Sequence, residues 1–201
     1  MKNPQRFRTF VAQFTKLVEN TGDEKRLHAE GSKLLADLIQ HDDWLPEECA
    51  RPHPQYYQQY LLHCDPLERF SVVSFVWGPG QKTPVHNHTV WGILGVMRGA
   101  ELCRRFDIPK PGAAMSAGPQ QRMDPGDIDH VSPSVGDIHV VENAYSDRTS
   151  ISIHIYGANI GAVKRHVFDA ATGTPKNFVS GYSNAAVPNF WDRSAEVRET
   201  I

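Results

Sequence analysis

From Tyr56 onward the chain consists of short runs of β-branched and aromatic residues, separated by clusters of Gly, Pro, Asp and Asn. Such runs predict strands, and the clusters between them predict turns. Many short strands at near-regular spacing are typical of a β-sandwich or a β-barrel, so the larger part of the chain is predicted to form one of these. We expect strands near 56–62, 70–77, 85–88, 92–97, 100–106, 127–131, 137–141, 149–156 and 163–168.

Two longer segments lack this pattern. Residues 109–125 are rich in Pro, Gly, Ser and Gln, and fit a long hairpin or a surface loop. Residues 173–201 fit a loop, and we expect its aromatic residues to pack it back on the barrel. These residues are Phe178, Tyr182, Phe190 and Trp191.

The residues before Tyr56 have a helical period. Apolar residues recur at steps of three and four from Phe7 to Val18 and again from Leu27 to Ile39, which predicts two amphipathic helices whose apolar faces pack on the sheet. A chain of 201 residues with 40% apolar content is long enough for one buried core and rather short for two. We therefore predict a single domain over residues 1–201, mainly β, with a helical region at residues 1–45 packed on the barrel.

The charge pattern excludes several classes of partner. The 21 basic and 23 acidic residues are spread along the chain and give a net charge of -2, so neither nucleic acid nor a membrane surface is expected as a partner. No apolar stretch approaches the ~20 residues that span a bilayer, and the N-terminus lacks the apolar core of a signal peptide. Three scattered cysteines without a C-x-x-C pair predict reduced thiols. We expect a cytoplasmic protein.

The ten histidines include one pair at ligand spacing, His86-Asn87-His88. Alternate residues of a strand share a face, so the two imidazoles could converge on one metal ion. The pair alone fits solvent-facing or hydrogen-bonded histidines equally well. Its surroundings favour the metal, because glycines flank the pair and a second histidine segment follows at a matching distance. The complete frame is Gly80, His86, His88, Gly92 and Gly99, then Gly126, Pro133, Gly136, His139 and Asn143.

This frame resembles the two motifs of the cupin family, with Gly92 at the position of the first motif's glutamate and the expected proline displaced by one residue to Pro133. The resemblance implies a cupin barrel, also described as a double-stranded β-helix or jelly roll. It also implies that His86, His88 and His139 hold one metal ion. Three neutral imidazoles leave a divalent ion its full charge, which favours binding of an anionic ligand.

Several segments further resemble the thiol dioxygenases, the family of cysteine dioxygenase and 3-mercaptopropionate dioxygenase. They are residues 70–78, 84–89, 136–139 and 152–157, of which the Ser-x-His-x-Tyr run is the most specific. The resemblance implies non-haem Fe(II) and the addition of O2 to the sulfur of a small thiol carboxylate. It also implies that Ser152 orients His154, His154 orients Tyr156, and the Tyr156 phenol acts at the iron site. An alternative is that these three residues simply form the polar face of a strand.

Two departures bear on the substrate. Gly92 replaces a cysteine that mammalian-type enzymes can join to the active-site tyrosine, so Tyr156 should be a free phenol. Gln59, or alternatively Gln58, stands where those enzymes carry a carboxylate-binding arginine. The bacterial glutamine-type branch, associated with 3-mercaptopropionate, places an arginine later in the chain, where this sequence has Arg165.

The resemblance thus implies a preference for 3-mercaptopropionate, with L-cysteine possible and Trp77 as a further pocket residue. Arg165 could also be half of a solvated basic pair with Lys164, and a strand Trp is often a core residue. Other readings are L-cysteine dioxygenase proper, a zinc or manganese cupin that isomerises or hydrolyses, and a non-catalytic metal-binding cupin that senses a small ligand. The sequence leaves the oligomeric state open.

Overall fold

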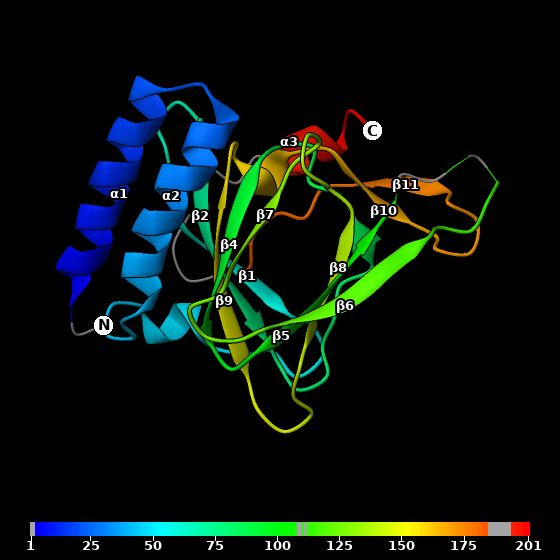
Figure 1. The fold of residues 1–201 in the computed structure, drawn as a ribbon, viewed down its shortest axis with the longest axis horizontal. Coiled ribbons are helices and arrows are strands. Elements are labelled where there is room, and N and C mark those ends of the chain that lie inside the picture. Colours follow the sequence, from blue (N-terminus) through cyan, green and yellow to red (C-terminus); the bar gives the residue numbers. More distant parts are fainter. Residues whose placement is uncertain (1–2, 108–109, 111, 185–193) are drawn as a thin grey trace.

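The computed structural model describes residues 3–107, 110, 112–184 and 194–201. Its first two helices are joined by three residues and lie side by side on one face of the barrel (Figure 1). Pro4 occupies the first turn of α1, where a missing N–H costs no hydrogen bond, and the Asp23 side chain caps α2 by accepting from the Lys25 N–H at 3.0 Å. The helices are α1 (Pro4–Asn20), α2 (Glu24–Ile39) and a short α3 (Ser194–Arg198).

Two antiparallel sheets form the barrel (Figure 1). The first has the strand order β1-β2-β9-β4-β7, and the second has the order β11-β10-β3-β8-β5-β6. Non-consecutive strands are therefore neighbours in both sheets, which brings residues from distant parts of the chain together. The strands are β1 (Gln58–Cys64), β2 (Ser71–Trp77), β3 (Val85–His86), β4 (Gly92–Arg98), β5 (Glu101–Phe106), β6 (Ala117–Met123), β7 (Ile128–Val131), β8 (His139–Asn143), β9 (Ser150–Tyr156), β10 (Arg165–Phe168) and β11 (Pro175–Phe178).

The first sheet separates two hydrophobic cores. On its outer face Phe14 and Leu35 of the helices pack with strand residues such as Ile153. On its inner face Val73 and Trp77 belong to the core that fills the barrel. Strands β2 and β9 are buried along their whole length because both of their faces are covered. The helices thus keep the inner face of this sheet free to line a cavity.

The predicted fold class, a mainly β barrel with N-terminal helices, is confirmed. Two segments are more regular than expected: the loop at 109–125 contains β6, and the loop at 173–201 contains β11 and α3. Phe178 and Tyr182 pack on the barrel as expected, whereas Phe190 and Trp191 lie outside the described residues. Among the described helices, none has the length and apolar character needed to cross a membrane.

Candidate metal centre and adjoining cavity

Three histidines converge inside the barrel. His86 ends β3 and pairs with His139, the first residue of β8, while His88 follows two residues after β3. The three ring centroids lie 4.8 to 4.9 Å apart, and one ligand atom from each ring lies within 4.8 Å of the others. The group that the sequence predicts therefore has the spacing of a shared metal site.

Each of the three rings uses its Nδ1 atom for a contact with the protein. The partner of His86 is the Pro84 carbonyl oxygen at 3.1 Å, and that of His139 is the Cys103 sulfur at 3.5 Å. His88 Nδ1 lies 3.2 Å from both the backbone oxygen and a carboxylate oxygen of Asp137. Such partners fix the ring orientation and leave Nε2 as the ligand atom.

The protonation of the three rings suits metal binding. Burial lowers the pKa of His86 to about 4, with Arg165 adding to the effect, and burial lowers the pKa values of His88 and His139 well below the usual range. Neutral imidazoles are the form that binds a metal. The His88 ring is fully buried, yet its Nε2 atom finds no hydrogen-bond partner among the described residues. A buried polar atom without a partner is costly, so this orphaned atom fits the place of a metal ligand.

The expectation that a strand holds both His86 and His88 is wrong for His88, because β3 ends at His86. The Asp137 carboxylate replaces the strand by accepting hydrogen bonds from the N–H groups of His88 at 3.0 Å and Thr89 at 2.9 Å. Thr89 has a φ of 62°, a backbone conformation that β-branched residues rarely adopt. Sequence reasoning did not give Asp137 this role, although its position two residues before His139 places it on the segment of the second motif.

A hydrogen-bonded line of side chains faces the histidines from β9. The Ser152 hydroxyl lies 2.8 Å from His154 Nε2, and His154 Nδ1 lies 2.8 Å from the Tyr156 hydroxyl. Burial lowers the pKa of His154 to about 3 and raises that of Tyr156, so both groups are neutral. The predicted alternation therefore places three polar groups in one continuous line, and the Tyr156 ring stacks on that of His88 at 5.5 Å.

Gly92 lies directly opposite Tyr156 in the pairing of β4 with β9. A Cβ atom added at Gly92 would stand 2.9 Å from the Tyr156 ring and 2.8 Å from a Val131 methyl group. Both distances are shorter than real Cβ contacts, so the tyrosine ring occupies the space that any other residue would fill. Because Gly92 carries no sulfur, it leaves the Tyr156 ring without a thioether partner at this position.

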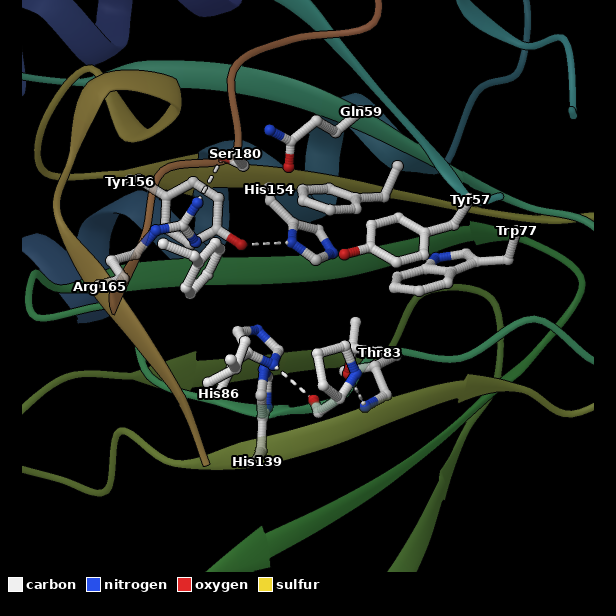
Figure 2. A pocket seen from close by; sticks show the side chains of 15 residues that line it. Tyr57, Gln59, Trp77, Thr83, His86, His139, His154, Tyr156, Arg165 and Ser180 are labelled. Atoms are coloured by element: carbon white, nitrogen blue, oxygen red, sulfur yellow. Dashed lines mark hydrogen bonds between the residues drawn. The ribbon is translucent and has the colours of Figure 1, made fainter. Parts of the chain in front are cut away.

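A cavity of about 130 Å³ separates His86 and His139 from the line on β9 (Figure 2). It is far smaller than the roughly 300–1,000 Å³ typical of sites for drug-sized ligands. The residues around it come from both sheets and from the segment after β11. They are Tyr57, Gln59, Phe75, Trp77, Thr83, Pro84, His86, His139, Val141, His154, Tyr156, Arg165, Val167, Phe178 and Ser180.

Arg165 brings a buried positive charge to this cavity. Its side chain is 4% exposed, which excludes the reading of a solvated pair with the exposed Lys164. The guanidinium donates to the Ser180 hydroxyl at 2.6 Å and lies over the Phe178 ring at 4.7 Å, while its Nε atom has no partner among the described residues. A buried cation with an unused donor is a strong candidate for binding an anion. Burial accordingly lowers the pKa of Arg165.

The choice between Gln59 and Gln58 is decided by the direction of β1. Gln59 is buried at the cavity, and its amide N–H group donates to the Gly181 carbonyl oxygen. Gln58 is half-buried, does not line the cavity, and donates to the backbone oxygens of Tyr56 and Tyr57. The Gln59 side chain thus holds the segment after β11 against the cavity.

Trp77 and Tyr57 form an aromatic wall at the cavity (Figure 2). Their ring centroids lie 4.9 Å apart, and the Trp77 indole N–H donates to the Ser152 hydroxyl at 3.3 Å. Trp77 was predicted as a pocket residue, and it lies at the cavity as well as in the barrel core. Tyr57 had no predicted role, and its position two residues before Gln59, on the same side of the extended chain, was the available signal.

The fold and the site define a cupin barrel with a three-histidine group that could hold a metal ion. No protein-family model matches the chain. Solved structures similar to it include an uncharacterised conserved protein with a double-stranded β-helix domain from Klebsiella pneumoniae, at 19% identity and a TM-score of 0.45, covering 60% of this chain and 95% of that one.

Two further similar structures have lower scores. A cupin superfamily protein from Desulfitobacterium hafniense matches at 14% identity and a TM-score of 0.42, over 62% of this chain and 87% of that one. An oxalate oxidase in complex with the substrate analogue glycolate matches at 14% identity and a TM-score of 0.40, over 63% and 56%. At these identities the likeness concerns the fold, so a proposal about activity has to rest on the site itself.

Proposed function

We propose that this protein is a non-haem iron thiol dioxygenase that converts a small thiol carboxylate, preferably 3-mercaptopropionate, to its sulfinic acid. The observation that carries the proposal is the meeting of three kinds of group at one small cavity. These are the three-histidine group, the Ser152–His154–Tyr156 line and the buried Arg165. A binding protein that only senses a ligand has no need of the hydrogen-bonded line.

The proposed metal is Fe(II), held by His86, His88 and His139. Three neutral nitrogen ligands leave open coordination positions, and bound iron would supply there the redox chemistry that couples a thiolate to dioxygen. In the overall reaction the thiol and one O2 give a sulfinic acid, so both oxygen atoms and the thiol hydrogen are retained in the product. The sulfur loses four electrons and O2 gains four, so no external reductant is needed.

Arg165 selects the carboxylate end of the substrate in this proposal. Its guanidinium is charged, desolvated and aimed at the cavity, where a carboxylate would receive charge-assisted hydrogen bonds. Among the described residues that line the cavity, none carries a carboxylate. The ammonium group of L-cysteine would therefore be desolvated beside Arg165 without an anionic partner, and 3-mercaptopropionate would not meet this cost.

Tyr156 serves as the positioned hydrogen-bond donor at the sulfur end. Its hydroxyl is anchored by His154, and its ring lies against His88, so the phenol is held beside the metal ligands. The aromatic wall of Trp77 and Tyr57 excludes water, which strengthens each polar contact inside the cavity.

The test uses iron-loaded protein with saturating oxygen and four compounds: 3-mercaptopropionate, L-cysteine, cysteamine and 3-hydroxypropionate. We expect oxygen uptake and a sulfinic acid carrying both atoms of labelled dioxygen, with the highest kcat/KM for 3-mercaptopropionate and no uptake with the hydroxy acid. Arg165→Ala should raise KM about a hundredfold or more, while Lys164→Ala, at the exposed neighbouring position, should leave it unchanged. No oxygen uptake with any thiol would refute the activity, and a preference for L-cysteine would refute the specificity.

A further inference from the structure

Glu101 is a buried carboxyl group to which neither motif assigns a role. It is the first residue of β5, it is 3% exposed, and it pairs with Asn143 on β8 and Met123 on β6. The Ser150 hydroxyl donates to its carboxylate oxygen at 3.2 Å. The Ser152 hydroxyl and the Trp77 indole also interact with this carboxyl by hydrogen bonding. Glu101 therefore stands next to Ser152, at the end of the β9 line remote from Tyr156.

The buried position makes the charged form of Glu101 unfavourable. Burial raises its pKa to about 7, although the hydrogen bonds from Ser152, Ser150 and Trp77 act in the opposite direction. No cationic side chain appears among the groups that shift this pKa. A carboxyl group held between its two protonation states can either donate a hydrogen bond or only accept one.

The directions of the hydrogen bonds along the line depend on that choice. The neutral His154 ring carries one proton, so one of its nitrogens must donate and the other must accept. If Ser152 donates to His154 Nε2, then His154 Nδ1 donates to the Tyr156 oxygen, and the phenol proton is free to point into the cavity. If Ser152 donates to an ionised Glu101 instead, His154 Nε2 donates to Ser152, and Nδ1 takes the phenol proton as an acceptor.

We propose that Glu101 is a positioning residue whose protonation sets the direction of the whole hydrogen-bonded line and thereby decides whether Tyr156 offers a donor to the cavity. Protonated Glu101 donates to the Ser152 oxygen and frees the Ser152 proton for His154. Ionised Glu101 reverses each bond in turn. The catalytic meaning of this arrangement rests on the proposed dioxygenase function, whereas the coupling itself is a property of the folded protein.

Few other groups can produce the same behaviour. The described residues that face Glu101 from β2, β8 and β9 are Trp77, Asn143 and the two serines, none of which titrates near neutral pH. The titratable groups that sense its charge are Cys103 on the same strand and Tyr156. Burial raises the pKa of Cys103 to about 12 and that of Tyr156 further, so both stay neutral over the range tested.

The test begins with kcat for 3-mercaptopropionate between pH 6 and pH 8. Glu101→Gln places an amide at this position, which donates to Ser152 at every pH. With half-protonation of the wild-type carboxyl near pH 7, the ratio of kcat in the variant to kcat in the wild type should rise about tenfold from pH 6 to pH 8. Glu142→Gln, a half-buried carboxyl on the neighbouring β8, is the matched control and should give a constant ratio.

A second measurement needs no turnover. Infrared difference spectra of the iron-loaded protein without oxygen should show a carboxylic acid band that titrates and is absent from Glu101→Gln. The phenol C–O band assigned with Tyr156→Phe should shift in step with it, because that band responds to donor or acceptor status. In Ser152→Ala the carboxyl band should still titrate while the phenol band stays fixed.

A phenol band that ignores the Glu101 titration in the wild type would overturn the inference, and so would a constant kcat ratio in an active Glu101→Gln enzyme. If no thiol is oxidised while the two bands shift together, the proposed function fails and the coupling stands. Failure of the Glu101→Gln variant to fold leaves the decision to the wild type and Ser152→Ala spectra.

Discussion

Substitution of Glu101 by glutamine should change how the stability of the protein depends on pH. Its carboxyl has a usual pKa of 4.5, which burial raises to about 7 in the folded protein. The folded state therefore keeps this proton over a range in which the unfolded chain has released it, and stability falls as the pH rises through that range. At about 1.36 kcal/mol per pKa unit, the complete loss is about 3 kcal/mol and is reached above pH 7.

Glutamine retains the shape of the side chain and carries no titratable proton, so the variant lacks this loss. Between pH 5 and pH 8 the free energy of unfolding of the variant, relative to the wild type, should rise by about 2.5 kcal/mol. Comparing the two proteins cancels the opposing contributions of the buried histidines, whose lowered pKa values make stability rise with pH instead.

Urea unfolding followed by circular dichroism, with both proteins in the same state of metal loading, measures this difference at each pH. The slope with respect to urea should be the same in both, which shows that the same surface becomes exposed on unfolding. A difference in unfolding free energy that stays constant within about 0.5 kcal/mol from pH 5 to pH 8 would refute the reasoning, because Glu101 would then titrate alike in both states. Glu142→Gln provides the same comparison for a carboxyl with little burial.

Three further results are expected. His88→Ala should lose nearly all bound iron, measured by elemental analysis, and retained stoichiometric iron would place the metal elsewhere. Tyr156→Phe should keep its iron and lower kcat by about 10²–10⁴-fold, and full activity would restrict the phenol to a packing role. Gly92→Ala should push the Tyr156 ring aside, reduce the free energy of unfolding by about 1–3 kcal/mol and lower kcat, while iron content, the internal control, stays unchanged. Unaltered kcat in that variant would contradict the close contact.

The features that could be predicted from the sequence are those fixed by local spacing. Histidines and glycines at set intervals indicated the three-histidine group, and strand alternation brought Ser152, His154 and Tyr156 to one face. The placement of Arg165 was also expected, although only the pairing of β10 with β3 and β11 shows that the side chain is buried.

Other features depend on contacts between distant segments. Glu101 becomes buried because β5 pairs with β8 and β6, and a single glutamate after a glycine turn does not indicate that environment. The position of His88 depends on the Asp137 carboxylate and not on a strand. Residues 175–178 form a strand only through pairing with β10, because a run of Pro, Lys and Asn has little intrinsic preference for a sheet.

The order of the site residues along the chain has a consequence for evolution. His86 and Tyr156, which lie at the metal centre, precede residue 157, whereas Arg165, Phe178 and Ser180, which surround the carboxylate-binding position, follow it. Recombination at one crossover point between these two groups would exchange the recognition of the acid end and leave the iron ligands and Tyr156 in place. Lineages of such proteins can therefore acquire new thiol substrates in one genetic step, with the oxygen chemistry inherited intact.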